Sequence, residues 1–426
     1  MKIQQLHTLF LECHSASTDT RKIKGNDMFF ALKGDNFNGN TYAAQAINLG
    51  AKYVIIDEPA YYKNSQTILV DNVLETLQEL ASFHRTFLNI PIIALTGSNG
   101  KTTTKELINA TLSKKYKTTA TVGNLNNHIG VPLTLLFMDK NTEIGIVEMG
   151  ANHLKEIAFL CQMAKPDYGY ITNFGKAHLE GFGGVEGVIK GKSEMYDYLM
   201  EHNKTIFVNT NDPIQLEKTK KTTTFTFGNK DQTPDVCVNF NEAQPFVICS
   251  YNDLSIKSQL IGDYNFSNIA AAIAIANYFK VDDKSIKQAI ENYIPANNRS
   301  QIIQKNSNKI ILDAYNANPT SMAAALHNFE KQTENKVAII GDMFELGIEA
   351  KQEHQYIVDL ANSLKINKLI FIGENFFQTK MDSDKISKYK SFSDFKEAFK
   401  PSSIENYTLL IKGSRGMALE RVLDLI

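Results

Sequence analysis

Residues 92–104, IIALTGSNGKTTT, place an apolar run before a glycine turn, which is followed by a lysine and three threonines. The run IIALT predicts a buried strand, and TTTKELINATLSKKY after it predicts a helix. The unpaired N–H groups and the positive end of such a helix are suited to binding a phosphate. The usual phosphate-loop pattern places its first glycine five residues before the second, whereas here Gly97 precedes Gly100 by only three.

The alternative to a phosphate loop is a glycine-rich turn whose threonine caps a helix. Because strand, turn, lysine and helix all occur together, we interpret the segment as a nucleotide-binding loop. We expect the Lys101 ammonium to lie near the β- and γ-phosphates and the Thr102 hydroxyl to bind Mg²⁺. The short glycine spacing is not explained by the general pattern.

The composition is that of an ordinary globular protein and excludes several classes. A chain of 426 residues predicts about two to four domains. Its formal charge of -1 gives no reason to expect nucleic acid or an anionic membrane as a partner. The four cysteines are far apart, which favours reduced thiols in a cytosolic protein over a metal site. The apolar run 269–279 falls short of the roughly 20 residues that a membrane span needs.

Two proline-containing junctions divide the chain into predicted domains 1–90, 91–294 and 295–426. In the first, FFAL (29–32) precedes a helix-to-strand unit over 43–57. The other two alternate short apolar runs with helical segments, which predicts an α/β fold with parallel sheets covered on both faces. Ligands bind at the carboxyl ends of such strands. The residues expected there are Thr96–Thr102, Glu148, Thr172–Asn173, Asp313, Asp342 and Lys412.

Several polar residues have an ordinary explanation when judged by position alone. Glu148 is explained equally well as a solvated strand end and as a metal ligand. A lone His178 in a loop is more often structural, and Lys192 would be a surface lysine. Asn265 and Asn268 stand one helical turn apart before an alanine-rich helix, where helix capping is the commoner role.

Eight segments taken together resemble the Mur ligase family, the ATP-dependent enzymes that build the peptide of bacterial peptidoglycan. This family has the short phosphate loop, G-x-x-G-K-[ST], which accounts for the spacing. Two segments, DAYNANP and GDMFELG, are most similar to the members that attach D-alanyl-D-alanine to UDP-N-acetylmuramoyl-tripeptide. The segments are TGSNGKTTTKE (96–106), GNLNNHIGVPLTLL (123–136), EMGANHLKEI (148–157), TNFGKAHLEGFGG (172–184), LIGDYNFSNIAAAIA (260–274), DAYNANPTSM (313–322), GDMFELG (341–347) and KGSRGMALE (412–420).

The resemblance implies three α/β domains and a defined reaction. An N-terminal domain would hold the UDP end of the substrate, a central parallel-sheet domain would bind ATP, and a Rossmann-like C-terminal domain would receive the dipeptide. The implied enzyme is an ADP-forming peptide synthase that works through an acyl phosphate. It would complete the cytoplasmic precursor of the cell wall, and so serve cell shape and division. It would be a monomer that uses ATP and two Mg²⁺ ions.

The resemblance also implies roles for individual residues. Lys101, Glu148, His178 and Lys192 would be the catalytic groups, with Lys192 carbamylated and so able to bind Mg²⁺ beside Glu148, His178 and Thr102. The implied ATP contacts are Gly97, Ser98, Asn99, Gly100, Lys101, Thr102, Thr103, Asn268 for adenine, Arg299 and Asp313 for ribose. The implied substrate contacts are Ser17, Asp19 and Arg21 on the uridine side, Asn124 and Asn127 near the muramoyl peptide, and Asn316 and Asn318.

The chain departs from the family pattern at a few positions, and two other readings compete. Asn38 and Asn40 stand where aspartate and histidine are usual, and Ala314 where serine is common. One alternative is another Mur-type or a folylpolyglutamate-type amide ligase, although the region before the phosphate loop argues against folate. The other is a nucleotide-binding regulatory protein without ligation chemistry, against which the combination of Lys101, Glu148, His178 and Lys192 argues.

Overall fold

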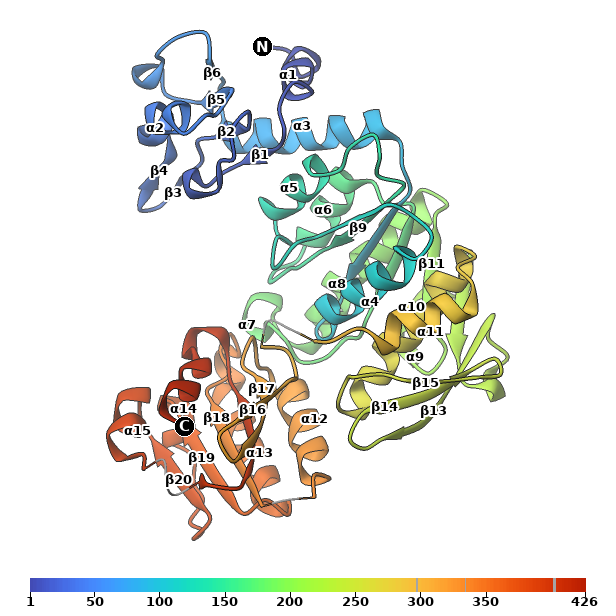
Figure 1. Ribbon diagram of the computed structural model, residues 1–426, viewed down its shortest axis with the longest axis vertical. Coiled ribbons are helices and arrows are strands. Elements are labelled where there is room, and N and C mark those ends of the chain that lie inside the picture. The colour runs from blue at the N-terminus through green and yellow to red at the C-terminus, as the bar shows by residue number, and fades with distance from the viewer. Residues whose placement is uncertain (296–297, 334, 401–403) are drawn as a thin grey trace.

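The computed structural model describes residues 1–295, 298–333, 335–400 and 404–426. The described residues form sheets of four, nine and six strands that follow one another along the chain, together with a two-stranded hairpin. Figure 1 shows them as a blue, a cyan-to-yellow and an orange-to-red part. Residues 296–297, within the predicted second junction, lie outside the described residues.

The N-terminal sheet is parallel, with the strand order β1-β2-β5-β6. The helix-to-strand unit predicted over 43–57 is present as α2 and β5, and Gly50 follows the helix with a φ of +98°. The elements are α1 (Ile3–Phe10), β1 (Ala16–Ser17), β2 (Met28–Phe30), β3 (Lys33–Gly34), β4 (Phe37–Asn38), α2 (Ala43–Asn48), β5 (Tyr53–Ile56), β6 (Thr67–Leu69) and α3 (Val73–Leu88). Helix α3 ends before Pro91, as the sequence predicts, and packs on the second part of the chain.

The middle sheet has the order β15-β14-β13-β12-β11-β10-β7-β9-β8. Its strands are β7 (Ile92–Thr96), β8 (Thr118–Ala120), β9 (Ile144–Glu148), β10 (Tyr168–Ile171), β11 (Thr205–Asn209), β12 (Thr224–Gly228), β13 (Val236–Ala243), β14 (Val247–Tyr251) and β15 (Leu254–Lys257). Its helices are α4 (Lys101–Leu112), α5 (Gly130–Leu136), α6 (Glu156–Ala164), α7 (Leu179–Phe182), α8 (Val185–Glu201), α9 (Pro213–Thr219), α10 (Phe266–Tyr278) and α11 (Asp283–Glu291).

The order of the middle strands decides where the site forms. β7 lies between β9 and β10 and is parallel to both, with Leu95 paired to Glu148 and Ile171 to Thr96. The carboxyl ends of the three strands therefore meet at one edge, on either side of the strand that carries the glycine turn. A crevice at such a position is where open α/β sheets bind ligands. Strands β13, β14 and β15 form antiparallel pairs. The sequence did not predict them, because only short, continuously apolar runs were interpreted as strands.

The C-terminal sheet has the order β16-β17-β21-β18-β19-β20, parallel except for the β16–β17 pair. Its strands are β16 (Gln301–Lys305), β17 (Asn308–Asp313), β18 (Lys336–Gly341), β19 (Lys368–Ile372), β20 (Ile386–Tyr389) and β21 (Thr408–Lys412). Its helices are α12 (Pro319–Glu330), α13 (Ala350–Ser363), α14 (Glu374–Phe377) and α15 (Phe392–Ala398). Asp313 and Lys412 are paired at the carboxyl edge of this sheet.

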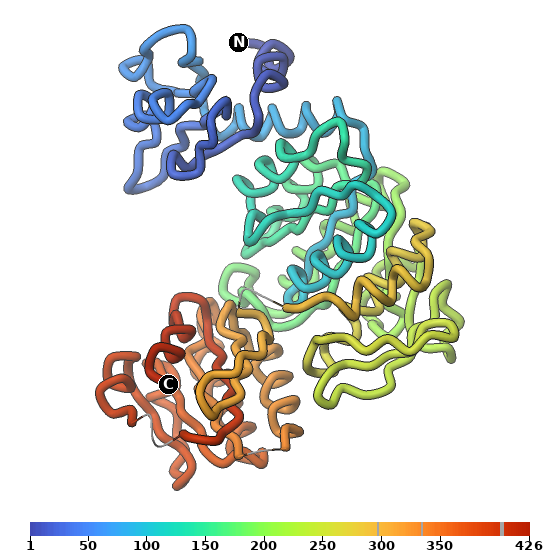
Figure 2. Tube along the Cα trace, in the orientation of Figure 1, coloured from blue at the N-terminus to red at the C-terminus, as the bar shows by residue number. Residues whose placement is uncertain are grey.

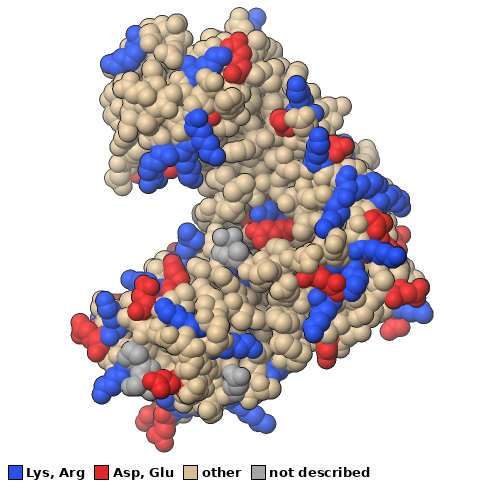
Figure 3. All heavy atoms as spheres, viewed as in Figure 1, with Lys and Arg blue, Asp and Glu red and all other residues tan. Residues whose placement is uncertain are grey.

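The three parts are arranged as an open arc, which the tube in Figure 2 follows from the N-terminal part at the top to the C-terminal part at the lower left. The space-filling view in Figure 3 shows a hollow on the inner side of this arc. The short helix α7 of the middle part extends toward the C-terminal part (Figure 1). Within the described residues, no helix has the length and apolar character required to cross a membrane.

Candidate active site

The glycine turn between β7 and α4 needs both of its glycines. Gly97 has a φ of +142°, and a Cβ there would lie 2.0 Å from Thr172 Oγ1. Gly100 has a φ of +78°, and a Cβ there would lie 2.5 Å from Asn268 Oδ1. Both positions combine a left-handed backbone with a close neighbour, so any side chain would displace the loop. The compact turn aims the first N–H groups of α4 at the space in front of it.

Lys101 lies at the start of α4 with its ammonium turned back over this turn. Its Nζ donates to Gly97 O over 2.7 Å, and the side chain is half-buried. Burial lowers the pKa of Lys101; the Glu148 carboxylate opposes this effect and the Arg299 guanidinium adds to it. Two cations therefore share a partly enclosed space with one carboxylate, an arrangement that favours a bound polyanion.

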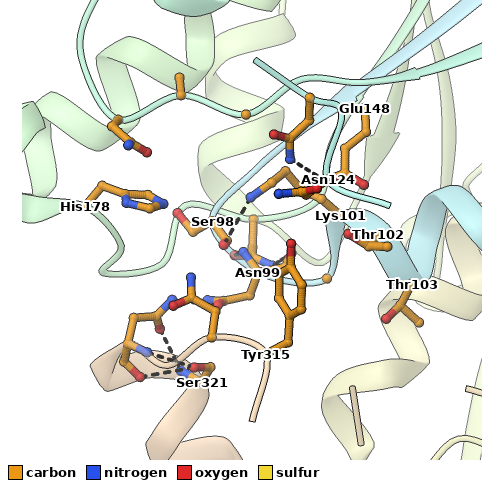
Figure 4. A pocket seen from close by; sticks show the side chains of 18 of the residues that line it. Ser98, Asn99, Lys101, Thr102, Thr103, Asn124, Glu148, His178, Tyr315 and Ser321 are labelled. Atoms are coloured by element: carbon orange, nitrogen blue, oxygen red, sulfur yellow. Dashed lines mark hydrogen bonds between the residues drawn. The ribbon is translucent and has the colours of Figure 1, made fainter. Parts of the chain in front are cut away.

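A cavity of about 800 Å³ joins the glycine turn to the carboxyl edge of the C-terminal sheet. In Figure 4 the side chains of Lys101, Glu148 and His178 point into this space, with the Tyr315 ring beneath them. The predicted site residues that line it are Ser98, Asn99, Gly100, Lys101, Thr102, Thr103, Asn124, Asn127, Glu148, His178, Asn268, Arg299, Asp313, Asn316 and Asn318. The predicted residues Gly97, Lys192, Ser17, Asp19 and Arg21 are not among its lining.

Glu148 is buried rather than solvated, with only 1% of its surface exposed. Asn126 Nδ2 donates to Glu148 Oε1 over 2.8 Å, while Glu148 Oε2 is buried and has no hydrogen-bond partner among the described residues. A buried carboxylate oxygen without a partner is unfavourable unless a cation or water binds it. Asn126 was not predicted, although it lies in the segment GNLNNHIG beside the two asparagines that were.

The oxygen atoms of Glu148 and Thr102 are ligands that fit Mg²⁺. Among the described residues, no three His, Cys, Asp or Glu side chains gather as ligands of one ion. The protein would supply the free Glu148 oxygen and the Thr102 hydroxyl, with phosphate and water oxygens as the remaining ligands. Few protein ligands and several water or phosphate ligands are typical of Mg²⁺ in nucleotide sites.

Lys192 is a core residue, which excludes the surface role that position alone suggested. Its side chain is fully buried in α8, where Nζ donates to Ala151 O over 3.0 Å and lies 4.9 Å from the centre of the Phe182 ring. Burial lowers the pKa of Lys192 well below its usual range, and the charge of Lys101 lowers it further. Burial therefore shifts the amine toward its neutral, nucleophilic form.

His178 comes directly before α7 with a left-handed φ of 54°. Its Nδ1 is hydrogen-bonded to the Glu345 carboxylate of the C-terminal part. This hydrogen bond is the main cause that lowers the pKa of Glu345. His178 thus links two parts of the chain, a contact that the sequence does not reveal.

The two asparagines at the start of the alanine-rich helix do not cap it with their side chains. Asn268 Nδ2 donates to Asn265 Oδ1 over 2.8 Å, and Asn268 Oδ1 accepts a hydrogen bond from Thr104 over 3.0 Å. Neither side chain caps α10. Instead, Asn268 ties α10 to α4 beneath the glycine turn.

On the C-terminal side, charged and aromatic groups face the turn. Lys412 is buried and forms a 2.5 Å ion pair with Asp313. The guanidinium carbons of Arg299 and Arg415 lie 3.6 and 4.9 Å from the centre of the Tyr315 ring. Tyr315 and Arg415 were not predicted as site residues, although both belong to segments that carry the family resemblance.

Asn318 serves both its own helix and the glycine turn. Its Oδ1 accepts from Ser321 N and caps α12, while its Nδ2 donates to Asn99 Oδ1 over 2.7 Å. Asn316 lines the cavity, and its backbone oxygen accepts from Lys412. The C-terminal part is therefore in direct contact with the glycine turn.

The predicted uridine-side residues lie on the N-terminal part. Ser17 ends β1 and donates to the backbone oxygen of Asp19, and Asp19 forms a 2.8 Å ion pair with Arg21. The hydrogen bond from Arg21 lowers the pKa of Asp19. Asn40, where the family usually has histidine, is buried and donates to Asp57 over 2.8 Å. Asn40 thus supports the local fold.

Comparison with known proteins gives the same three-part division. Three family models match the chain: Mur ligase family, catalytic domain over 12–85, Mur ligase middle domain over 95–276, and Mur ligase, glutamate ligase domain over 298–415. The UDP-N-acetylmuramoyl-tripeptide–D-alanyl-D-alanine ligase of Bacillus subtilis (strain 168) is 35% identical, over 97% of this chain and 93% of that protein. That of Escherichia coli (strain K12) is 32% identical, over 96% and 92%.

Solved structures agree with these matches. MurF from Acinetobacter baumannii superposes with a TM-score of 0.85 and 30% identity, over 100% of this chain and 98% of that one. MurF ligase from Thermotoga maritima, in complex with ADP, gives a TM-score of 0.82 and 26% identity, over 98% and 97%. The resemblance and the three-domain α/β fold predicted from the sequence are confirmed. The chain belongs to the Mur ligase family of ATP-dependent ligases.

Proposed function

We propose that this chain joins D-alanyl-D-alanine to UDP-N-acetylmuramoyl-tripeptide, with cleavage of ATP to ADP and phosphate. The proposal rests above all on one cavity that connects the glycine turn to the Tyr315–Ser321 segment of the C-terminal domain. The similarity to ligases of that name over nearly the whole chain supports the same substrates. The proposed domains are 1–90 for the UDP end, 91–294 for ATP and 295–426 for the dipeptide.

The reaction would proceed in two steps. An oxygen of the tripeptide carboxylate attacks the γ-phosphorus of ATP. The bond between the γ-phosphorus and the oxygen that bridges it to the β-phosphate breaks. ADP departs, and the tripeptide carries an acyl phosphate. The dipeptide amine then attacks the carbonyl carbon, loses a proton and displaces phosphate. Since two anions meet in the first step, their repulsion must be offset. Lys101, Arg299 and the first N–H groups of α4 are suited to this task.

Mg²⁺ would supply positive charge to the phosphate oxygens when bound. Thr102 and Glu148 would hold one ion, and Glu148, His178 and a carbamate on Lys192 would hold another. The free Glu148 oxygen supports the first assignment. The burial and lowered pKa of the Lys192 amine support the carbamate, because the neutral amine can add to CO₂ with loss of a proton to give a carboxylate.

The remaining assignments follow the two sides of the cavity. Asn268, Arg299 and Asp313 would contact the nucleotide, and Asn316 and Asn318 the dipeptide. Asn124 and Asn127 would contact the muramoyl peptide, and Ser17, Asp19 and Arg21 the uridine end. Because the reaction consumes ATP, we place it in the cytoplasm, and we propose a monomer.

The test is phosphate release from ATP by the full-length protein with UDP-N-acetylmuramoyl-tripeptide, measured with and without D-alanyl-D-alanine. We expect release only when both substrates are present. Single amino acids or glutamate in place of the dipeptide test the other Mur-type and folylpolyglutamate-type reactions. Release with glutamate and a folate acceptor, or none with the dipeptide, would overturn the proposal. The folylpolyglutamate synthase of Mycobacterium tuberculosis, at 12% identity and a TM-score of 0.61, shares the fold alone.

A further inference from the structure

The segment GDMFELG (341–347) carries two carboxylates, of which Glu345 faces His178 of the middle domain and Asp342 anchors the segment. Asp342 accepts from the backbone N–H groups of Asn375 and Phe376, each over 3.0 Å. Met343 N donates to His354 Nε2 over 3.0 Å. The buried side chains of Met343 and Leu346, which flank Phe344 and Glu345, anchor the segment further.

Glu345 is exposed, as its neighbour Phe344 is, between these anchored residues. Its side chain is about half exposed, its φ is +61°, and its carboxylate meets His178 Nδ1. Its backbone oxygen also accepts from Glu180 N over 3.2 Å. His178 too has a left-handed backbone, at +54°. Non-glycine residues in this conformation cluster at functional sites, where the surroundings hold them.

The contact fixes the imidazole in one arrangement. An ionised carboxylate only accepts hydrogen bonds, so His178 Nδ1 is the donor in this contact, and in the neutral imidazole Nε2 is then the nitrogen that has a lone pair. Since His178 lines the cavity while Glu345 approaches from the C-terminal domain, Nε2 is the nitrogen left for the cavity. Histidines that bind metals usually donate their other ring N–H to a carboxylate or carbonyl in this way.

We propose that Glu345 is a positioning residue, which orients His178 toward the cavity only while the C-terminal domain is docked on the middle domain. This inference rests on the proposed function, because it gives His178 its use there. In this proposal the segment GDMFELG orients a metal ligand, and His178 is correctly oriented only when the two domains are closed.

A plain interdomain contact is the competing explanation, and the chain offers a matched control for it. Lys176, two residues before His178, forms a 2.5 Å ion pair with Glu353 across the same interface. Glu353 does not touch His178. Glu353→Gln therefore weakens docking without altering the imidazole, whereas Glu345→Ala does both and Glu345→Gln keeps an oxygen that accepts from Nδ1.

The experiment uses the full-length protein with Mn²⁺ in place of Mg²⁺ and a non-hydrolysable ATP analogue. Electron spin-echo envelope modulation detects the nitrogen of an imidazole bound to Mn²⁺. We expect this signal in the parent protein, in Glu353→Gln and in Glu345→Gln, and its loss in Glu345→Ala and His178→Ala. Loss of an orienting partner of this kind costs about 10- to 100-fold in metal affinity or activity. We expect kcat of Glu345→Ala to fall by that factor, with KM for ATP little changed.

Three results would overturn the inference: no imidazole signal in the parent protein, an unchanged signal in Glu345→Ala, or equal effects of Glu345→Ala and Glu353→Gln. Thermal unfolding of each variant shows whether it is folded, and Glu345→Gln serves as the test if Glu345→Ala is not. The spectroscopic readout needs no ligation. If the parent protein shows the signal but releases no phosphate with the dipeptide, the proposed function fails while the positioning role stands.

Discussion

Replacing Asn126 by alanine should weaken the binding of Mg²⁺ with nucleotide while leaving the fold intact. The Asn126 amide donates to Glu148 Oε1 over 2.8 Å and leaves Oε2 without a partner, so it determines which oxygen is free for the ion. Without it, the buried carboxylate loses its donor and can rotate. The backbone oxygen of Asn126, which accepts from Gly150 N, is unaffected by the substitution.

The magnitude follows from the chemistry of this hydrogen bond. A hydrogen bond to a charged group contributes roughly 1.5–3 kcal/mol. At about 1.4 kcal/mol per factor of ten, the Mg²⁺ concentration that gives half-maximal binding should rise roughly 10- to 150-fold. The same range is observed when partners of metal-binding side chains are removed, about 10- to 100-fold.

The assay is a Mg²⁺ titration of the full-length protein with a non-hydrolysable ATP analogue, followed by calorimetry or nucleotide fluorescence. Asn141→Ala is the matched control, because its amide donates to the Asp139 carboxylate over 3.0 Å on an exposed loop outside the cavity. We expect the control to behave like the parent protein. An Asn126→Ala protein that is folded and shows the parental Mg²⁺ dependence would refute the reasoning that Asn126 orients Glu148.

Four further predictions test other parts of the structure. Lys101→Ala should abolish ATP-dependent ligation with an unchanged circular dichroism spectrum, and near-normal turnover would remove the phosphate-loop role. Lys192→Ala should be nearly inactive and partly recovered by added short carboxylates, whereas full activity without them would exclude the carbamate. Gly97→Ala should abolish binding of a fluorescent ATP analogue, because its Cβ would lie 2.0 Å from Thr172 Oγ1. Burial first, and the nearby His84 second, lower the pKa of His7 from 6.5 to about 4, so unfolding exposes a group that takes up a proton. The contribution of His7 to the free energy of unfolding should therefore be present above pH 6.5 and be lost as the pH falls toward 4. Urea unfolding should show a loss of about 2 kcal/mol at pH 5. This loss should be smaller in His7→Phe.

The sequence by itself determined the fold class and the place of the site. Short apolar runs alternating with helical segments indicated parallel sheets, and polar residues at their carboxyl ends had to meet at one edge. Thr96–Thr102 and Glu148 come together for this reason, since β7 and β9 are neighbouring parallel strands. The glycines at 97 and 100 were informative for a local reason, because both adopt backbone conformations that other residues avoid.

Only the tertiary structure decided how these residues are used. The free oxygen of Glu148, the burial of Lys192 and the contact of Glu345 with His178, 167 residues away, depend on which distant segments pack against each other. Periodicity reports which face of an element is apolar, but it does not report which partner covers that face or how two domains dock. Side-chain orientation and pKa follow from those long-range contacts, because burial and neighbouring charges set both.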